Sequence, residues 1–227
     1  MVDDMEKRIK DMLLNLGADV CGIADIGRFA DAPKGFHPTD VFDRCTSVVV
    51  FGRRMPKGTA VVSPRIVYNL ATDLSLIELD RIAQQAALYL EDMGATAVPI
   101  PSDSPYDYWD AETQTGRGII SLRHTAVLAG LGSIGKHTLV INRTYGTMLG
   151  FGAILTDLKL RTDQMEMSLC IEACRICLDG CPVKALDGVT TKQALCRPHT
   201  YGTNTRGHNV TNCNKCRTNC PLAHGVR

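Results

Sequence analysis

Apolar residues recur at helical spacing in two stretches of the first half of the chain. In residues 5–16 they stand on one face, at Met5, Ile9, Met12, Leu13 and Leu16. That stretch ends at Gly17, and a longer stretch of the same kind, residues 69–93, ends at Gly94. Because one side of a helix collects residues three and four apart and glycine favours helix ends, both stretches are predicted to be helices.

Four short apolar runs have the length and composition of strands instead. They are DVCGIAD (residues 19–25), SVVVFG (47–52), TAVPIP (96–101) and GFGAILTDL (150–158). Turn-forming or polar residues bound these runs, which indicates buried strands. Helices and strands together predict an α/β, or mixed α+β, N-terminal domain over residues 1–160.

Composition and charge indicate the cellular location of the protein and the partners it is expected to lack. The chain has 227 residues, 44% of them hydrophobic, and a formal net charge of +1. No apolar run approaches the ~20 residues of a membrane-spanning helix, and the N-terminus lacks an apolar signal core. We therefore expect a soluble, cytoplasmic protein without membrane contact. The near-zero charge gives no general attraction to nucleic acid.

The cysteines indicate a different kind of domain in the rest of the chain. Eight of the ten lie between residues 170 and 220, and only Cys21 and Cys45 precede them. In a reducing compartment such a density favours metal binding over disulfides. We therefore predict a second domain over residues 161–227 that binds metal.

The first cysteine run, CIEACRICLDGCP, resembles the bacterial ferredoxin pattern C-x2-C-x2-C-x3-C-P. That pattern binds [4Fe–4S] clusters, because closely spaced thiolates can reach several irons of one cube. Cys174, Cys177 and Cys181 fit its last three places. Cys170 stands one residue earlier than the first place requires.

The second run, CNKCRTNCP, fits the same last three places with Cys213, Cys216 and Cys220. Its first place holds Val210, and Cys196 lies upstream to supply the missing thiolate. Two related runs therefore predict two clusters.

The ferredoxin pattern also predicts which cysteines share a cluster. Its cysteine before proline ligates the other cluster, so each run lends one cysteine to its partner. The first set would be Cys170, Cys174, Cys177 and Cys220, and the second set Cys181, Cys196, Cys213 and Cys216. Two structural zinc sites are the alternative, because C-x2-C pairs also bind zinc. A run of four cysteines ending in Cys-Pro favours iron.

A glycine-rich stretch, AGLGSIGKH, is the other candidate for a cofactor site. It satisfies G-x-G-x-x-G and nearly satisfies G-x-x-x-x-G-K-[ST], but a histidine replaces the Ser or Thr. The segment before it reads as helix, which disfavours a dinucleotide site. The loop could pack closely against a neighbour or approach a large flat cofactor. The cofactor-binding candidates are Gly130, Leu131, Gly132, Ser133, Gly135, Lys136 and His137.

This loop, the stretch GTMLGFGAILTDLKL and the two cysteine runs together resemble the epoxyqueuosine reductase family, which is related to the reductive dehalogenases. The resemblance implies a cobalamin-binding α/β domain, a C-terminal ferredoxin-like domain with two [4Fe–4S] clusters, and reductive chemistry at cobalt. It also implies that residues 130–137 lie against the corrinoid. His124 and His137 flank the loop and are expected to be surface or capping residues rather than cobalt ligands.

Two features depart from that family. Its acidic proton donor aligns here near Gly116, where no carboxylate stands. The candidates to replace it are Asp103, Asp107, Asp110, Tyr106 and Tyr108. The chain also ends seven residues after Cys220, where epoxyqueuosine reductases continue into a helical extension that helps to grip tRNA. Both features make tRNA the less favoured substrate.

We therefore expect an iron–sulfur oxidoreductase that passes single electrons through two [4Fe–4S] clusters to an acceptor at the glycine loop. The acceptor would be a corrinoid (cobalamin) or a small molecule, and the electron donor a ferredoxin or flavodoxin. One alternative is an epoxyqueuosine reductase that acts on tRNA. Another is a ferredoxin-like carrier or corrinoid activator without a substrate of its own.

Overall fold

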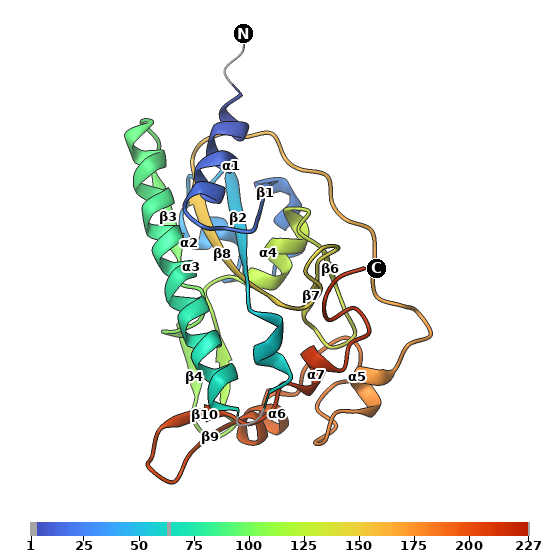
Figure 1. The fold of residues 1–227 in the computed structure, drawn as a ribbon. Helices are drawn as coiled ribbons and strands as arrows, with labels where there is room; N and C mark the ends of the chain where they lie inside the picture. Colours follow the sequence, from blue (N-terminus) through green and yellow to red (C-terminus); the bar gives the residue numbers. More distant parts are fainter. Residues whose placement is uncertain (1–3, 63–64, 227) are drawn as a thin grey trace.

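The centre of the molecule is a four-stranded antiparallel sheet with the order β1-β2-β8-β3 (Figure 1). The computed structural model describes residues 4–62 and 65–226. The strands are β1 (Val20–Asp25), β2 (Ser47–Arg54), β3 (Ala97–Ile100) and β8 (Leu149–Thr156). These are the four runs that the sequence predicts as strands, so that prediction is confirmed.

Helices cover both faces of this sheet. α1 (Met5–Asn15) and α3 (Ile66–Asp92) pack on one face, and α4 (Leu122–Leu128) packs on the other. Both predicted helices are present, although α3 begins three residues before the predicted start. The mixed α/β prediction is confirmed, with the sheet as the middle of three layers.

Alternation along the strands divides the core in two. Val49 and Phe51 of β2 face α1 and α3, whereas Val48 and Val50 face α4. All four side chains are at most 1% exposed. Because successive strand residues point to opposite faces, a strand covered on both sides reads as an unbroken apolar run. This explains the sequence SVVV.

Short elements connect the sheet to the rest of the molecule. They are η1 (Ile26–Phe29), α2 (Pro38–Val41), η2 (Lys57–Ala60), β4 (Tyr108–Asp110), β5 (Thr115–Arg117), β6 (Ser133–Ile134) and β7 (Val140–Ile141). β4 pairs with β5, and β6 with β7. The glycine-rich loop therefore runs through β6.

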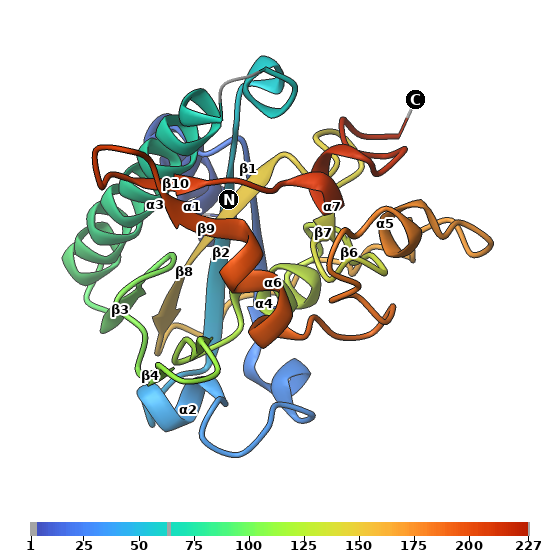
Figure 2. The same ribbon diagram turned by 90° about the horizontal axis from the view of Figure 1, so that it is seen from below.

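The last third of the chain has little regular structure. Its elements are α5 (Ile176–Asp179), α6 (Gln193–Thr200), β9 (Tyr201–Thr203), β10 (Asn209–Thr211) and α7 (Lys215–Thr218). Seen from below, α6, α7 and the β9–β10 hairpin lie across the lower end of the α/β layers (Figure 2). The boundary at residue 160 and the ferredoxin-like fold stay predictions.

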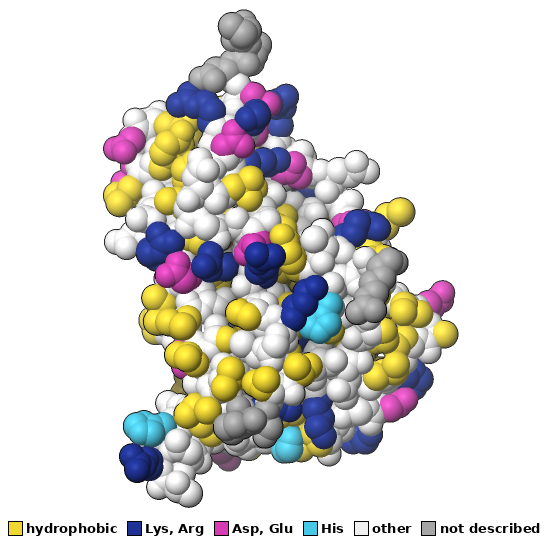
Figure 3. Space-filling model, viewed as in Figure 1, with side chains coloured by type: hydrophobic (Ala, Val, Ile, Leu, Met, Phe, Trp, Pro, Cys, Tyr) yellow, Lys and Arg dark blue, Asp and Glu magenta, His cyan; other side chains and the backbone are white. Residues whose placement is uncertain are grey.

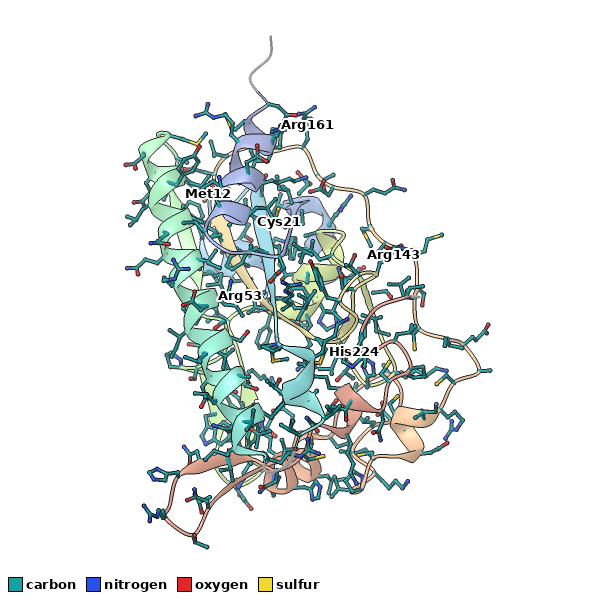
Figure 4. The ribbon with its side chains drawn as sticks, viewed as in Figure 1. Met12, Cys21, Arg53, Arg143, Arg161 and His224 are labelled. Atoms are coloured by element: carbon teal, nitrogen blue, oxygen red, sulfur yellow. The ribbon has the colours of Figure 1, made fainter. Side chains whose placement is uncertain are left out.

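An extended segment, residues 157–169, leads from β8 along the outside of the molecule to the cysteines (Figure 4). Near its start, Arg161 binds Asp4 at 2.6 Å and Glu6 at 2.8 Å. Further along, Arg143 binds Glu166 at 2.8 Å. Ion pairs therefore tie the segment to the N-terminal layers at both ends.

The outer side of α3 is apolar over its first half. Its exposed apolar residues there are Ile66, Val67, Leu70, Leu74 and Ile77. Figure 3 shows apolar side chains gathered over this part of the molecule. No helix within the described residues is long and apolar enough to cross a membrane.

Candidate metal centres

Four cysteines from the two runs line one cavity. Cys170 and Cys174 precede α5, Cys177 lies in it, and Cys220 follows α7. α5 and α7 are in contact, which brings the two runs together. These are the four residues that the ferredoxin exchange rule assigns to one cluster.

The rest of this cavity is almost entirely apolar. Its other lining residues are His137, Ile141, Ile171, Pro221 and Leu222. Among the described residues, no three His, Cys, Asp or Glu side chains converge as ligands of a single metal ion. Four cysteines around one cavity match a cluster whose iron corners each take one thiolate.

The surroundings of these thiols disfavour their ionised form. Burial raises the pKa of the Cys220 thiol, and the neighbouring thiols of Cys170, Cys174 and Cys177 raise it further. The same two causes act on Cys177. Several thiolates in an apolar site are unfavourable without positive charge, which metal ions supply. The donor set therefore fits an iron–sulfur cluster.

The structure shows fewer contacts among the cysteines of the second predicted set. Burial raises the pKa of the Cys216 thiol, and the thiols of Cys196 and Cys213 lie close enough to contribute. Cys181 accepts a hydrogen bond from Ala185 N at 3.3 Å. Backbone hydrogen bonds connect Ala185 to Lys192 and Lys192 to Cys196, which ties the turn at Cys181 to α6.

The glycine loop contacts the protein itself. Gly130 and Gly132 have φ angles of 78° and 150°, which only glycine adopts readily. A Cβ atom at these positions would lie 2.2 Å from Gln164 O and 2.3 Å from Ile141 O. Close packing against backbone therefore explains both glycines.

Polar residues of the loop hold the first cysteine run in place. Lys136 Nζ donates hydrogen bonds to the carbonyls of Glu172 and Cys174, the latter at 3.0 Å. The Ser133 hydroxyl accepts a hydrogen bond from Leu169 N at 2.8 Å. This bracing of the first cysteine run was missed by sequence reasoning, which had only the loop's own pattern. The predicted contact with a corrinoid stays a prediction.

Two further loop residues are buried. Leu131 belongs to the core on the α4 side of the sheet. His137 is 2% exposed and lines the cysteine cavity. The expectation of a surface position for His137 is therefore wrong, although its Nδ1 does accept a hydrogen bond from Leu139 N at 3.1 Å, as a capping residue would.

Two arginines, Arg123 and Arg217, lie near His137 of the first cavity and near Cys216 of the second set. Arg217 follows Cys216 and donates to the carbonyls of Thr147 and Leu149. Burial lowers the pKa of His137 to about 4, with further contributions from Arg217 and Arg123. Their positive charge lies where two anionic clusters would need compensation.

Of the candidate proton donors, Tyr106 is the most firmly held. Its hydroxyl donates to Asp103 at 3.0 Å and accepts from Arg197 Nη2 at 3.0 Å. Its ring stacks on Trp109, and the Arg197 guanidinium lies over both rings. Burial raises the pKa of Tyr106, so the hydroxyl keeps its proton at neutral pH.

Tyr106 also lines a cavity with a volume of about 270 Å³. Asp103 and Asp107 line it as well. The remaining candidates are otherwise engaged: Asp110 accepts hydrogen bonds from Glu112 N and Thr113 N in a turn. The exposed Tyr108 lies under the Arg117 guanidinium.

Comparison with known proteins finds sequence relatives that are reductases. No family model matches it. Tetrachloroethene reductive dehalogenase of Dehalobacter restrictus is 27% identical over 178 residues, which cover 77% of this chain and 28% of that protein. Epoxyqueuosine reductase of Lactococcus garvieae is 33% identical over 112 residues, which cover 44% and 31%. The chain is a relative of both groups. It matches about a third or less of the length of each of these relatives.

Solved structures show the same relationship in the fold. The epoxyqueuosine reductase of Streptococcus thermophilus matches with a TM-score of 0.68 and 18% identity, over 98% of this chain and 67% of that one. A catabolic reductive dehalogenase in complex with 3-bromo-4-hydroxybenzoic acid matches with a TM-score of 0.70 and 18% identity, over 95% and 31%. The chain therefore shares its fold with these two proteins.

Proposed function

We propose that the chain is an iron–sulfur oxidoreductase that passes single electrons through two [4Fe–4S] clusters to a bound acceptor. The observation that carries the proposal is the cavity lined by Cys170, Cys174, Cys177 and Cys220, because it unites two separate runs in the predicted combination. The second cluster would be held by Cys181, Cys196, Cys213 and Cys216. A ferredoxin or flavodoxin would supply the electrons.

A corrinoid is the acceptor that the relatives support. One solved neighbour, a reductive dehalogenase, is described as suggesting a mechanism for B12-dependent dehalogenation. When bound, cobalamin would supply a strongly reducing cobalt centre. The chain's own part would be to hold the clusters in an apolar site, brace them through Lys136 and Ser133, and place a proton donor near the substrate.

We assign the proton donor to Tyr106. Its hydroxyl borders the cavity of about 270 Å³ and is held by Asp103 and Arg197. We expect Tyr106→Phe to lower the rate of substrate reduction by about 100-fold, the lower end of what a positioned general acid contributes. Iron content and cluster spectra should not change, whereas Tyr108→Phe, on the exposed neighbour, should leave the rate unaltered. Equal rates for wild type and Tyr106→Phe would refute this assignment.

A tRNA-modifying reductase is the second candidate. An epoxyqueuosine reductase solved with an epoxyqueuosine-modified tRNA stem loop matches this chain with a TM-score of 0.63. This function predicts binding to such a stem loop with an affinity that falls steeply as salt concentration rises. A carrier without a substrate predicts no such binding and no turnover.

Anaerobic purification of the full chain tests the main proposal. We expect about eight iron and eight sulfide per chain, the content of two cubanes, with a reducible visible absorption. Added cobalamin should shift its absorption bands on binding. Zinc in place of iron, or two thiolate sets that bind no metal, would contradict the proposal.

A further inference from the structure

His137 stands apart from the other residues around the first cysteine set. It is the only lining residue with a polar side chain other than the four cysteines. The ring is 2% exposed, so water does not reach it freely. Nothing in the proposed electron path assigns it a task.

Its hydrogen bonds fix where its proton lies. Leu139 N can only donate, so His137 Nδ1, 3.1 Å away, must accept and carries no proton. A neutral imidazole then carries its proton on Nε2. Nε2–H is therefore the donor of the ring.

This donor has no partner. His137 Nε2 is buried and forms no hydrogen bond within the described part of the chain. A buried donor without an acceptor is unfavourable and calls for an explanation. The side chains that share its cavity with the cysteines are apolar: Ile141, Ile171, Pro221 and Leu222. Sulfur is the acceptor that this cavity offers.

The sequence next to His137 keeps its ring in place. A Cβ atom at position 135 would lie 2.6 Å from His137 Cε1 and 3.0 Å from Nε2. Gly135 therefore leaves the room that the ring occupies. Lys136, between the two, binds the carbonyl of Cys174 and joins the histidine to the cysteine run.

We propose that His137 Nε2–H donates a hydrogen bond to a sulfur of the cluster held by Cys170, Cys174, Cys177 and Cys220. The acceptor is an inorganic sulfide or a ligating thiolate. This inference rests on the proposed function, because it requires a cluster in that cavity. His137 is a positioning residue that tunes the cluster and transfers no electron itself.

This hydrogen bond would change the reduction potential of one cluster. Hydrogen bonds to cluster sulfur stabilise the reduced state, which carries one more negative charge, and so raise the reduction potential. Because the ring is neutral, His137 achieves this without adding a charge. The second cluster should be affected less, since none of its four cysteines lines the cavity of His137.

Three variants separate the hydrogen bond from packing. His137→Phe keeps a ring but removes the donor, and His137→Gln keeps an N–H. His124→Phe is the matched control, because His124 also flanks the loop but binds the Ser121 hydroxyl instead. Iron content and the reduction potential of each cluster are measured on the anaerobic full chain by redox titration followed with electron paramagnetic resonance.

In His137→Phe we expect the equilibrium constant for reduction of one cluster to fall about tenfold, the scale of a hydrogen bond to a charged group. His137→Gln should recover part of the loss, and His124→Phe should match wild type. Wild-type iron content with unchanged potentials in His137→Phe would overturn the inference and leave the proposed function standing. Absence of iron clusters from the wild-type chain would overturn both.

A measurement on the wild type tests the same hydrogen bond without a variant, so it does not depend on a variant that folds. With 15N-labelled histidine, the reduced cluster should show a weak hyperfine coupling to one histidine nitrogen. Its iron–sulfur stretching bands should shift in D2O, since the donated proton exchanges. A wild-type cluster with neither signal would also overturn the inference.

Discussion

The two regions of the molecule are stabilised in different ways. Before residue 161, the described residues form three apolar core clusters that cover both faces of the sheet. After residue 160, none of the described residues joins those clusters. The few buried apolar residues there are Cys177, Leu178, Ala185 and Ala223. A segment this poor in buried apolar area needs another source of order, and metal is the usual one in small domains.

Backbone groups form several of the contacts between the two regions. Arg217 binds carbonyls at the start of β8, and Thr147 N donates to Ala223 O at 3.1 Å. A Cβ atom on Gly146 would lie 2.0 Å from Leu222 O, so only glycine allows this approach. The cysteine region is therefore closely fitted to the sheet region.

The largest expected effect comes from removing the proposed clusters. In Cys174→Ser, or after chelation of iron, residues 165–226 should lose most of their hydrogen-exchange protection, whereas the strands of the sheet keep theirs. Hydrogen exchange followed by mass spectrometry resolves the two regions. Cys21→Ser, outside both cysteine runs, is the control and should leave the second region protected. Unchanged protection in Cys174→Ser would mean that the cysteine region is ordered without its cluster.

The next largest effect tests the apolar region. Leu79 of α3 is fully buried, and Leu79→Ala should lower the free energy of unfolding by about 2–5 kcal/mol. Leu74→Ala, on the same helix but 52% exposed, should change it by no more than ~0.5 kcal/mol. Denaturant unfolding followed by circular dichroism measures both. Similar losses in the two variants would contradict the described orientation of α3.

The smallest effect concerns the ion pairs that hold the connecting segment. Hydrogen bonds from Arg161 lower the pKa of Glu6 from 4.5 to about 2. A carboxyl with a lowered folded-state pKa stabilises the fold above pH 4.5 and loses that contribution as the pH falls towards 2. Because Arg161 is largely exposed, we expect less than ~1 kcal/mol at pH 7.

Glu6→Gln should therefore be less stable than wild type at pH 7, and the difference should vanish near pH 2. Thermal unfolding at several pH values follows this convergence. Glu91→Gln, at the exposed end of α3, is the control. A difference that stays constant down to pH 2 would indicate that Glu6 acts through packing instead of charge.

Local patterns predicted the elements of the sheet region well. The strand with Pro99 lies at the edge of the sheet, where a missing N–H is tolerated. The start of α3 was predicted too late, because Arg65 caps it without a side-chain hydrogen bond and so left no signal. The first cysteine set was predicted from a known spacing rule, and its four members share a cavity.

The contacts of the glycine loop could not be predicted in the same way. Gly130 packs against Gln164, and Lys136 against Glu172, residues that follow much later in the chain. The pattern G-x-G-x-x-G indicates that another group packs closely against the glycines. It does not indicate which residue that group belongs to. The burial of His137 could not be predicted either, because it also depends on residues distant in sequence.

The sequence by itself determined the strands, the main helices and the grouping of eight cysteines, because these depend on periodicity and spacing along the chain. Only the tertiary structure decided that the glycine loop braces the first cysteine run and that His137 faces the cysteines. Those relations join residues distant in sequence, and their physical basis, close packing and an unpaired buried donor, exists only once the chain has folded.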